Sequence, residues 1–179
     1  MPLYYITGLA GAGKSTVRRE LKTHGYAAPG VDEEGYGEWI DRKTGKVIPY
    51  PHHDKNLDFH DWYERHEWEL SPTKIARLKR RADKEKTPIF LCGSASGEDK
   101  VWHLFDKVLA LVIDEETLKH RLATRTDNQF GKTPGELAIE LRLHGTYEDT
   151  MKNHGAHTID ATRPSAEVVD EILRYTKLR

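Results

Sequence analysis

The segment Gly8–Ser15, which reads GLAGAGKS, constrains the fold of this chain more than any other feature. It fits the pattern GxxxxGKS/T without a mismatch, between an apolar run at Leu3–Thr7 and a segment in which Val17 and Leu21 lie four residues apart. A loop of this kind needs a buried strand entering it and a helix leaving it. Both are predicted, a strand over Leu3–Thr7 and a helix over Lys14–His24, so a glycine-rich turn that matches by chance is the weaker interpretation.

The residue types of this loop suit a phosphate group. Small residues over Gly11–Gly13 let backbone N–H groups turn inward around an anion, and the N-terminus of the following helix adds partial positive charge. Lys14 is placed to reach β- and γ-phosphates, and the Ser15 hydroxyl is placed to ligate Mg²⁺. The predicted nucleotide-binding residues of the loop are Gly8, Leu9, Ala10, Gly11, Ala12, Gly13, Lys14, Ser15 and Thr16.

Short apolar runs alternate with longer amphipathic segments along the chain. Further strands are expected in a short piece ending near Val31-Asp32 and at Pro88–Cys92, Val108–Ile113 and His157–Asp160. Strands separated by helices predict an α/β fold, with a parallel sheet of about five strands and helices on both faces. The length of 179 residues fits one such domain, over residues 1–179. Ligands bind at the carboxyl ends of the strands in sheets of this kind.

The helices between these strands carry start signals. Ser71 followed by Pro72 predicts an N-cap with a first-turn proline, Asp114 predicts another N-cap, and Thr133–Glu136 has the form of a capping box. The predicted helices cover Asp58–Leu70, the segments after Ser71 and Asp114, about Leu137–Asn153, and Arg163–Leu178.

Asp32 is the first candidate for chemistry outside the loop. It follows the second predicted strand and should lie near the γ-phosphate, where a carboxylate accepts a proton from a hydroxyl or holds a metal-bound water. Glu33 and Glu34 are adjacent alternatives, and an ordinary acidic loop is the competing interpretation. The third predicted strand ends in Cys92–Gly97 without a carboxylate. Either Asp32 supplies a second metal contact, or Ser15, phosphates and water hold Mg²⁺.

Arginines follow the fourth predicted strand. Arg121 and Arg125 lie four apart on one helical face, from which both can point at a transferring phosphoryl group and neutralise its charge. Residues 121–136, with Gly131 and polar neighbours, predict a lid that excludes water. Arg163, after the last strand, is expected to border the nucleotide base. A solvated basic face, or a simple turn for Arg163, is the alternative in each case.

Composition excludes several classes of protein. The 28 Lys and Arg residues balance 29 Asp and Glu residues, so no overall charge attracts nucleic acid or anionic lipid. One cysteine excludes an intramolecular disulfide. The longest aliphatic run, Val108–Ile113, is too short for a membrane span, and the N-terminus does not read as a secretion signal. A cytoplasmic protein that acts without nucleic acid or membrane is expected.

Residues 33–86 are expected to form an insertion, and within it Glu33–Leu57 is the segment that is hardest to assign and should be rich in loops. The insertion holds several glycines and prolines and then the aromatic residues Trp39, Phe59, Trp62, Tyr63 and Trp68. These side chains are expected to pack within an insertion; an aromatic wall for a ring-shaped ligand is the alternative.

Taken with Asp32, the Arg121–Arg125 segment and the turn Asp160–Pro164, the loop Gly8–Thr16 makes the chain resemble the small phosphate-loop kinases. These are the nucleoside, nucleotide and shikimate kinase-like enzymes of the adenylate-kinase type. The resemblance implies a single domain with a five-stranded parallel core, an acceptor-binding insertion between the second and third strands, and a lid bearing arginines. Two departures stand out: the chain reads VDEE in place of DxD at Asp32, and CGSAS at Cys92–Ser96 in place of a glycine triplet.

The resemblance implies an ATP- and Mg²⁺-dependent kinase that transfers the γ-phosphoryl group to a nucleoside, a nucleotide or a polar metabolite. Lys14, Asp32, Arg125 and Arg121 are the expected catalytic residues, Ser15 and Asp32 the metal contacts, and Arg125 and Arg163 further nucleotide contacts. A monomer or homodimer would suffice. The rival hypothesis is a nucleotide-binding regulatory ATPase or assembly module that has no small acceptor.

Overall fold

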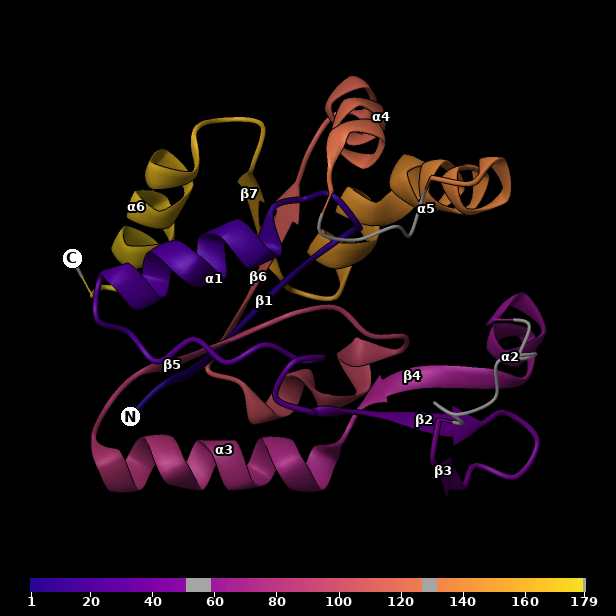
Figure 1. The fold of residues 1–179 in the computed structure, drawn as a ribbon. Helices are drawn as coiled ribbons and strands as arrows, with labels where there is room; N and C mark the ends of the chain where they lie inside the picture. Colours follow the sequence, from indigo (N-terminus) through magenta and orange to yellow (C-terminus); the bar gives the residue numbers. More distant parts are fainter. Residues whose placement is uncertain (51–58, 127–131, 179) are drawn as a thin grey trace.

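Four parallel strands form the central sheet of the computed structural model, which describes residues 1–50, 59–126 and 132–178. They are β1 (Leu3–Gly8), β5 (Ile89–Cys92), β6 (Lys107–Val112) and β7 (His157–Asp160), in the order β5-β1-β6-β7 (Figure 1). Because β1 lies between β5 and β6, its carboxyl end opens at the middle of the sheet. The phosphate-binding loop predicted from the sequence follows directly from that end.

The expectation of five strands is corrected to four. The segment before Val31 runs beside β5 and makes only isolated parallel bridges, Ala27 with Ile89 and Gly30 with Cys92. Pro29 lies between the two bridges and has no N–H to donate, which interrupts a regular ladder. The segment nevertheless delivers Asp32 to the same edge of the sheet as a fifth strand would.

Side chains on β1 alternate between two apolar layers. Tyr4 and Ile6 pack with α1 (Lys14–Thr23), α4 (Glu115–Thr124) and α6 (Ser165–Tyr175). Leu3 and Tyr5 pack on the other face, with α3 (Pro72–Glu85) and the 3-10 helix η1 (Glu98–Leu104). Figure 1 shows α1 and α6 above the sheet and α3 below it. Helices thus cover both faces, as the alternation of strands and helices predicts; η1 was not expected.

The helix α5 (Pro134–Asn153) lies beside β6 and β7. The capping box at its start is confirmed, because the Thr133 hydroxyl accepts a hydrogen bond from the Glu136 backbone N–H at 3.3 Å. Asp114 likewise caps α4 through the N–H of Thr117 at 2.7 Å. Ser71 stands at the N-cap position of α3, but its side chain makes no capping hydrogen bond.

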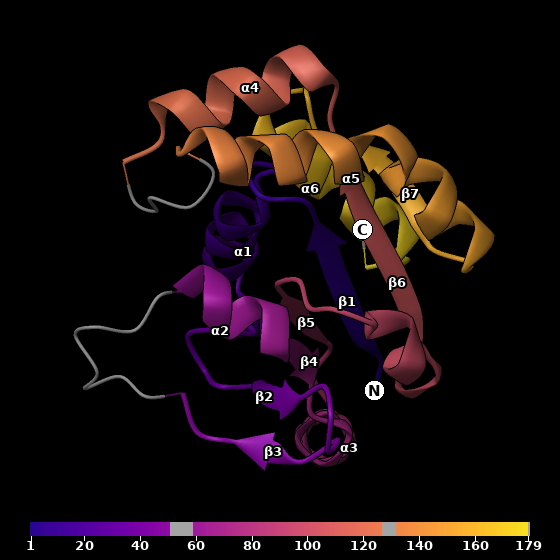
Figure 2. The same ribbon diagram turned by 90° about the vertical axis from the view of Figure 1, so that its right-hand side faces the viewer.

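A small antiparallel sheet is inserted after Asp32. It consists of β2 (Gly37–Asp41), β3 (Val47–Ile48) and β4 (His66–Leu70), in the order β3-β2-β4. The helix α2 (Phe59–Arg65) precedes β4 and lies over this sheet in Figure 2. The single helix predicted over Asp58–Leu70 is therefore wrong in its second half.

The reason lies in the pairing of β4 with β2. Trp68 stands opposite Trp39 in the register of the two strands, and their ring centroids are 5.4 Å apart. The sequence HEWEL also alternates, with His66, Trp68 and Leu70 separated by glutamates. This period of two is typical of a strand, and strand pairing prevailed over the helical pattern of the residues before it.

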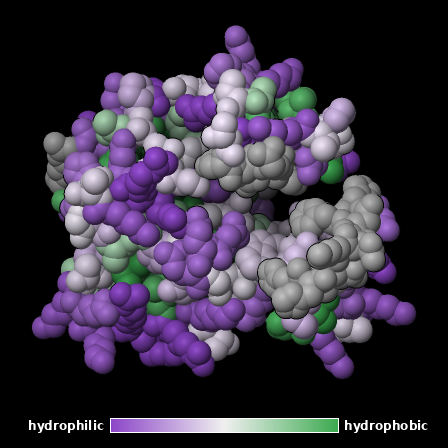
Figure 3. Space-filling view, viewed as in Figure 1, coloured by the Kyte–Doolittle hydropathy of each residue, from purple (hydrophilic) through white to green (hydrophobic). Residues whose placement is uncertain are grey.

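Figure 3 shows hydrophilic side chains over most of the face that it presents. Among the described residues, no helix combines the length and the apolar character needed to cross a membrane.

Candidate functional site

The loop between β1 and α1 has a conformation that its glycines make accessible. Gly11 and Gly13 have φ angles of 80° and 100°, in the left-handed region that residues with a Cβ atom rarely adopt. Gly13 is the N-cap of α1, no side chain caps this helix, and its first turn contains no acidic residue. The positive end of α1 is therefore available to an anion bound in the loop.

The side chain of Lys14 folds back over the loop. Its Nζ donates hydrogen bonds to the carbonyl oxygens of Gly8 at 2.6 Å and Leu9 at 2.9 Å. Burial lowers the pKa of Lys14, and the negative charges of Glu140 and Glu98 oppose that effect. The ammonium group is thus held by main-chain atoms at the start of the loop, where the polyphosphate is expected.

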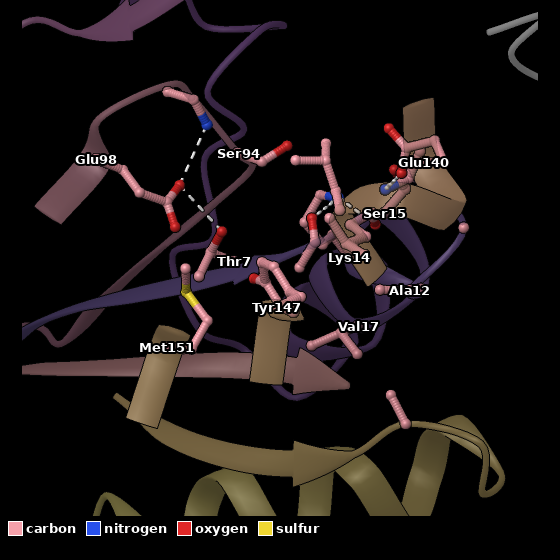
Figure 4. Close-up of a pocket in the computed structure, with 18 of the residues that line it drawn as sticks. Thr7, Ala12, Lys14, Ser15, Val17, Ser94, Glu98, Glu140, Tyr147 and Met151 are labelled. Carbon is pink, nitrogen blue, oxygen red and sulfur yellow. Dashed lines mark hydrogen bonds between the residues drawn. The ribbon is translucent and has the colours of Figure 1, made fainter. Parts of the chain in front are cut away.

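A cavity of about 1410 Å³ opens over the loop and is lined by the whole of residues 8–16. Its walls come from the insertion (Trp39, Tyr63 and Trp68), from the segment after β5 (residues 94–99), from α5, and from the turn after β7. Figure 4 shows Lys14 and Ser15 on one side of this cavity and Glu98 on the other. A cavity of this size has room for a nucleotide and a second small molecule.

Asp32 lines the same cavity as the phosphate loop; its position near a γ-phosphate stays a prediction. Burial and the neighbouring charge of Glu33 raise the pKa of Asp32, while Lys14, Trp68 and Arg18 act in the opposite direction. A carboxylate with a raised pKa, near a lysine and inside a cavity, is a suitable proton acceptor. Ser15 lines the cavity as well, so a hydroxyl and a carboxylate, two oxygen donors of the kind that Mg²⁺ prefers, face the same space.

Among the described residues, no group of three or more His, Cys, Asp and Glu side chains has the arrangement of a metal site. The donors at hand suit a magnesium ion that keeps several waters and binds the phosphates directly. That mode of binding requires few protein ligands.

The three arginines of the sequence prediction all line the cavity. Arg121 donates to the carbonyl oxygens of Gly11 at 3.4 Å, Ala12 at 3.5 Å and Ala161 at 2.9 Å. These contacts support the loop from α4 and tie it to the turn after β7. A contact between Arg121 and a phosphate stays a prediction.

Arg125 is the C-cap residue of α4 and lies near Lys14, whose pKa its charge lowers. Arg163 donates to the carbonyl oxygen of Asp160 at 3.1 Å and is paired with Glu171, so its position after β7 is fixed. Part of the predicted lid, residues 127–131 with Gly131, lies outside the described residues.

No protein-family model and no curated protein sequence matches the chain. Solved structures do match it over nearly the full length. A shikimate kinase from Acinetobacter baumannii, in complex with shikimate, aligns with a TM-score of 0.60 at 18% identity and covers 98% of this chain and 93% of its own. The chain has the fold of the small phosphate-loop kinases.

Two other structures with this kinase fold align equally broadly. A sugar kinase from Janibacter sp. HTCC2649 has a TM-score of 0.57 at 17% identity and covers 99% of this chain and 95% of its own. A deoxyadenosine kinase from M. mycoides, with bound dATP, has a TM-score of 0.52 at 15% identity, with 99% and 100% coverage. The three neighbours are named for three different acceptors, so the fold alone does not select one.

Two buried carboxylates that were not predicted from the sequence border the phosphate loop. Glu98 is 6% exposed and accepts hydrogen bonds from Tyr5 and Thr7 on β1. Glu140 is also 6% exposed and accepts a hydrogen bond from the backbone N–H of Ala10 at 3.2 Å. Burial raises the pKa of both groups. The segment after β5 thus contains a carboxylate, one residue beyond the stretch Cys92–Gly97 in which none was found.

One face of α5 was missed as well. Glu140, Tyr147, Met151 and His154 all line the cavity. The Tyr147 hydroxyl oxygen is buried, and burial raises the pKa of this side chain. Glu140, Tyr147 and Met151 are separated by seven and four positions, which places them on one side of α5, and this spacing was the signal available in the sequence; His154 is the C-cap residue that follows the helix.

Proposed function

We propose that this chain is an ATP- and Mg²⁺-dependent phosphotransferase that moves the γ-phosphoryl group onto a hydroxyl or phosphate of a nucleoside, a nucleotide or a polar metabolite. The observation that carries the proposal is a single cavity lined by the phosphate loop with Lys14, by Asp32, and by the aromatic residues of the insertion. A nucleotide-binding loop, a proton acceptor and a wall for a second molecule therefore face one space.

In this proposal the loop amides and the start of α1 bind the phosphates of ATP. Lys14 leaves its carbonyl contacts for the β- and γ-phosphates and neutralises the charge that develops on them. The Ser15 hydroxyl would hold Mg²⁺, with Asp32 as the second candidate, and the ion would supply positive charge against the phosphates. Arg125 adds a second positive charge near Lys14 and contacts the phosphates.

Asp32 acts on the acceptor. The acceptor hydroxyl oxygen forms a bond to the γ-phosphorus atom, the bond from that atom to the bridging oxygen of ADP breaks, and the hydroxyl proton passes to the Asp32 carboxylate. Its raised pKa makes it a better base than an exposed aspartate. Trp39, Tyr63 and Trp68 border the space beside Asp32 and would pack on the acceptor.

The test is a screen for acceptor-dependent release of ADP. Purified protein is incubated with Mg·ATP and, one at a time, adenosine, thymidine, AMP, shikimate, glucose and gluconate. Release that depends on one of these compounds, together with its phosphorylated product, supports the kinase. ADP release that no acceptor stimulates supports the regulatory ATPase instead. The Lys14→Ala variant, purified in parallel, excludes a contaminating kinase because it should lose the activity.

A further inference from the structure

The carboxylate of Glu98 receives three hydrogen bonds in the interior of the molecule. The Tyr5 hydroxyl donates at 2.7 Å, the Thr7 hydroxyl at 3.1 Å and the backbone N–H of Ala95 at 3.1 Å, all to the same oxygen, Oε2. Figure 4 shows the side chains of Glu98 and Thr7 pointing toward each other, with a dashed line for their hydrogen bond. The three donors come from two parts of the chain, β1 and the segment after β5.

The β1 donors lie directly before the phosphate loop. Tyr5 and Thr7 point to the same side of the strand, and Thr7 is followed by Gly8, the first residue of the loop. Tyr5 is fully buried and its ring stacks on Phe105, at 5.0 Å between centroids. The Tyr5 ring is therefore held in place by packing that does not involve Glu98.

The third donor belongs to the opposite wall of the cavity. Ala95 lies in the segment of residues 93–97, and its neighbour Ser96 donates its backbone N–H to the carbonyl oxygen of Trp68 at 2.7 Å. Trp68 lines the cavity with Asp32 and belongs to the inserted sheet. A continuous chain of contacts thus runs from β1 through Glu98 to residues 93–97 and on to Trp68. We call residues 93–97 together with Trp68 the acceptor wall.

At a buried position that is only packed, a carboxylate is less favourable in free energy than an apolar side chain. Burial raises the pKa of Glu98, which means that its charged form is disfavoured there, and an apolar side chain would avoid that cost. Charged acceptors, however, form shorter and stronger hydrogen bonds than neutral ones and hold their donors in a narrower geometry. The charge of Glu98 also acts on Lys14.

We propose that Glu98 is a positioning residue, which fixes the acceptor wall relative to the phosphate loop and so sets the distance between the acceptor and the γ-phosphate. This inference rests on the proposed function. Glu98 acts through Thr7 and Ala95, and phosphoryl transfer depends steeply on alignment because the reacting atoms must approach in line.

The experiment removes the donors one at a time. Tyr5→Phe and Thr7→Val each delete one hydroxyl, and Thr7→Ser restores the hydroxyl at the second position. Tyr4→Phe is the matched control: Tyr4 is the neighbouring buried tyrosine, and its hydroxyl donates to the carbonyl oxygen of Thr176 at 3.2 Å, away from the acceptor wall. Glu98→Gln keeps the shape of the side chain and removes its charge. These variants leave the result independent of whether Glu98→Gln itself folds.

Three measurements decide the question. Titration calorimetry with Mg·ADP should give affinities within about twofold of the wild type for the four variants of Tyr4, Tyr5 and Thr7, which keep the charge of Glu98. Hydrogen exchange at the amides of Ala95 and Ser96 should accelerate about tenfold or more in Tyr5→Phe, Thr7→Val and Glu98→Gln, and stay unchanged in Tyr4→Phe and Thr7→Ser. In Tyr5→Phe, Thr7→Val and Glu98→Gln, phosphoryl transfer to the acceptor found in the screen should fall about tenfold. The rate of ATP hydrolysis, in which water is the acceptor, should stay within about twofold of the wild type.

The ratio of transfer to acceptor over transfer to water is the readout that general loss of structure would not change. Unchanged exchange at Ala95 and Ser96 would overturn the proposal, as would equal losses in both transfers. A wild-type protein that phosphorylates none of the compounds defeats the proposed function; the exchange result then still decides whether Glu98 orders the acceptor wall.

Discussion

The Glu140 carboxylate accepts a hydrogen bond from the backbone N–H of Ala10, so a negative charge from α5 lies on the phosphate loop itself. Lys14 and Arg125 both act on this carboxylate, and burial raises its pKa. If the loop binds a polyphosphate as proposed, an anion at this position would compete with it for the same amides and cations. Nucleotide binding and the ionisation of Glu140 would therefore be coupled.

Replacing Glu140 by Gln should tighten the binding of Mg·ATP several-fold. The amide oxygen can still accept from Ala10, and the repulsion between two anions is removed, an effect of about 1 kcal/mol across a partly solvated separation. Titration calorimetry at pH 7.5 checks the change. Glu136→Gln, which removes a carboxylate from the exposed first turn of α5, is the control for net charge. Weaker binding in Glu140→Gln would contradict the prediction.

The raised pKa of Glu140 also predicts how stability changes with pH. The folded protein binds a proton at this group more tightly than the unfolded chain, whose pKa is near 4.5. The corresponding stabilisation is complete below that value and is lost as the pH rises through the folded-state pKa. Urea unfolding between pH 4 and pH 8 should show this loss in the wild type and a smaller loss in Glu140→Gln. Equal slopes in the two proteins would refute the assignment.

Lys14→Ala should reduce phosphoryl transfer by about 100- to 1000-fold, the usual effect of deleting one charged group that stabilises a transition state. Stability should change little, because the Nζ contacts of Lys14 are made to loop carbonyls and not to the core. The control is Lys22→Ala. Lys22 is an exposed lysine of the same helix, and its Nζ lies 3.6 Å from Oε1 of Glu34. Steady-state kinetics and thermal unfolding separate the two effects; near-wild-type turnover in Lys14→Ala would exclude its catalytic role.

Arg121→Ala should lower the free energy of unfolding by about 2 kcal/mol, since it removes charged hydrogen bonds to the carbonyls of Gly11, Ala12 and Ala161. Lys119→Ala, which breaks an exposed pair with Glu115 on the same helix, should cost only about 0.3 to 0.5 kcal/mol. Urea denaturation of both variants measures the difference. Equal costs would mean that Arg121 does not support the loop.

Two Gly→Ala substitutions should change the free energy of unfolding in opposite directions. A Cβ atom at Gly37 would lie 2.2 Å from the Trp68 ring, so Gly37→Ala must displace that indole and should cost about 1 to 3 kcal/mol. Gly145 is in α5, where an added Cβ atom would meet nothing within 4 Å apart from neighbouring residues and the backbone of its own helix, and Gly145→Ala should stabilise the protein by up to about 1 kcal/mol. Thermal unfolding and tryptophan fluorescence report both. A harmless Gly37→Ala would show that Trp68 is not fixed against β2.

Cys92 should resist alkylation in the folded protein. The thiol is 3% exposed, and burial raises its pKa to about 12, so almost no thiolate is present at neutral pH. Iodoacetamide at pH 8 should leave the native protein unmodified and label it fully in urea, as mass spectrometry will show. Rapid labelling without denaturant would mean that β5 opens readily.

Local rules were enough to predict much of the fold. The loop Gly8–Ser15 with its flanking strand and helix, the caps at Asp114 and Thr133, and the long apolar strands each depend on residues close together in sequence. Where a partner far along the chain decides the structure, the prediction failed. Residues 66–70 became a strand because Gly37–Asp41 lies alongside, and the expected fifth strand was reduced to isolated bridges beside β5.

The sequence by itself determined the phosphate loop, because backbone conformation and residue type there follow from a contiguous motif. Only the tertiary structure decided what surrounds it. Glu98 reaches Tyr5 across 93 positions and Glu140 reaches Ala10 across 130, and no periodicity records such a distance. Glu98 lies beside the loop because the parallel sheet brings the ends of β1 and β5 to one edge, and Glu140 does so because α5 packs beside β6 and β7. Burial and charge then act on groups that are far apart in the sequence.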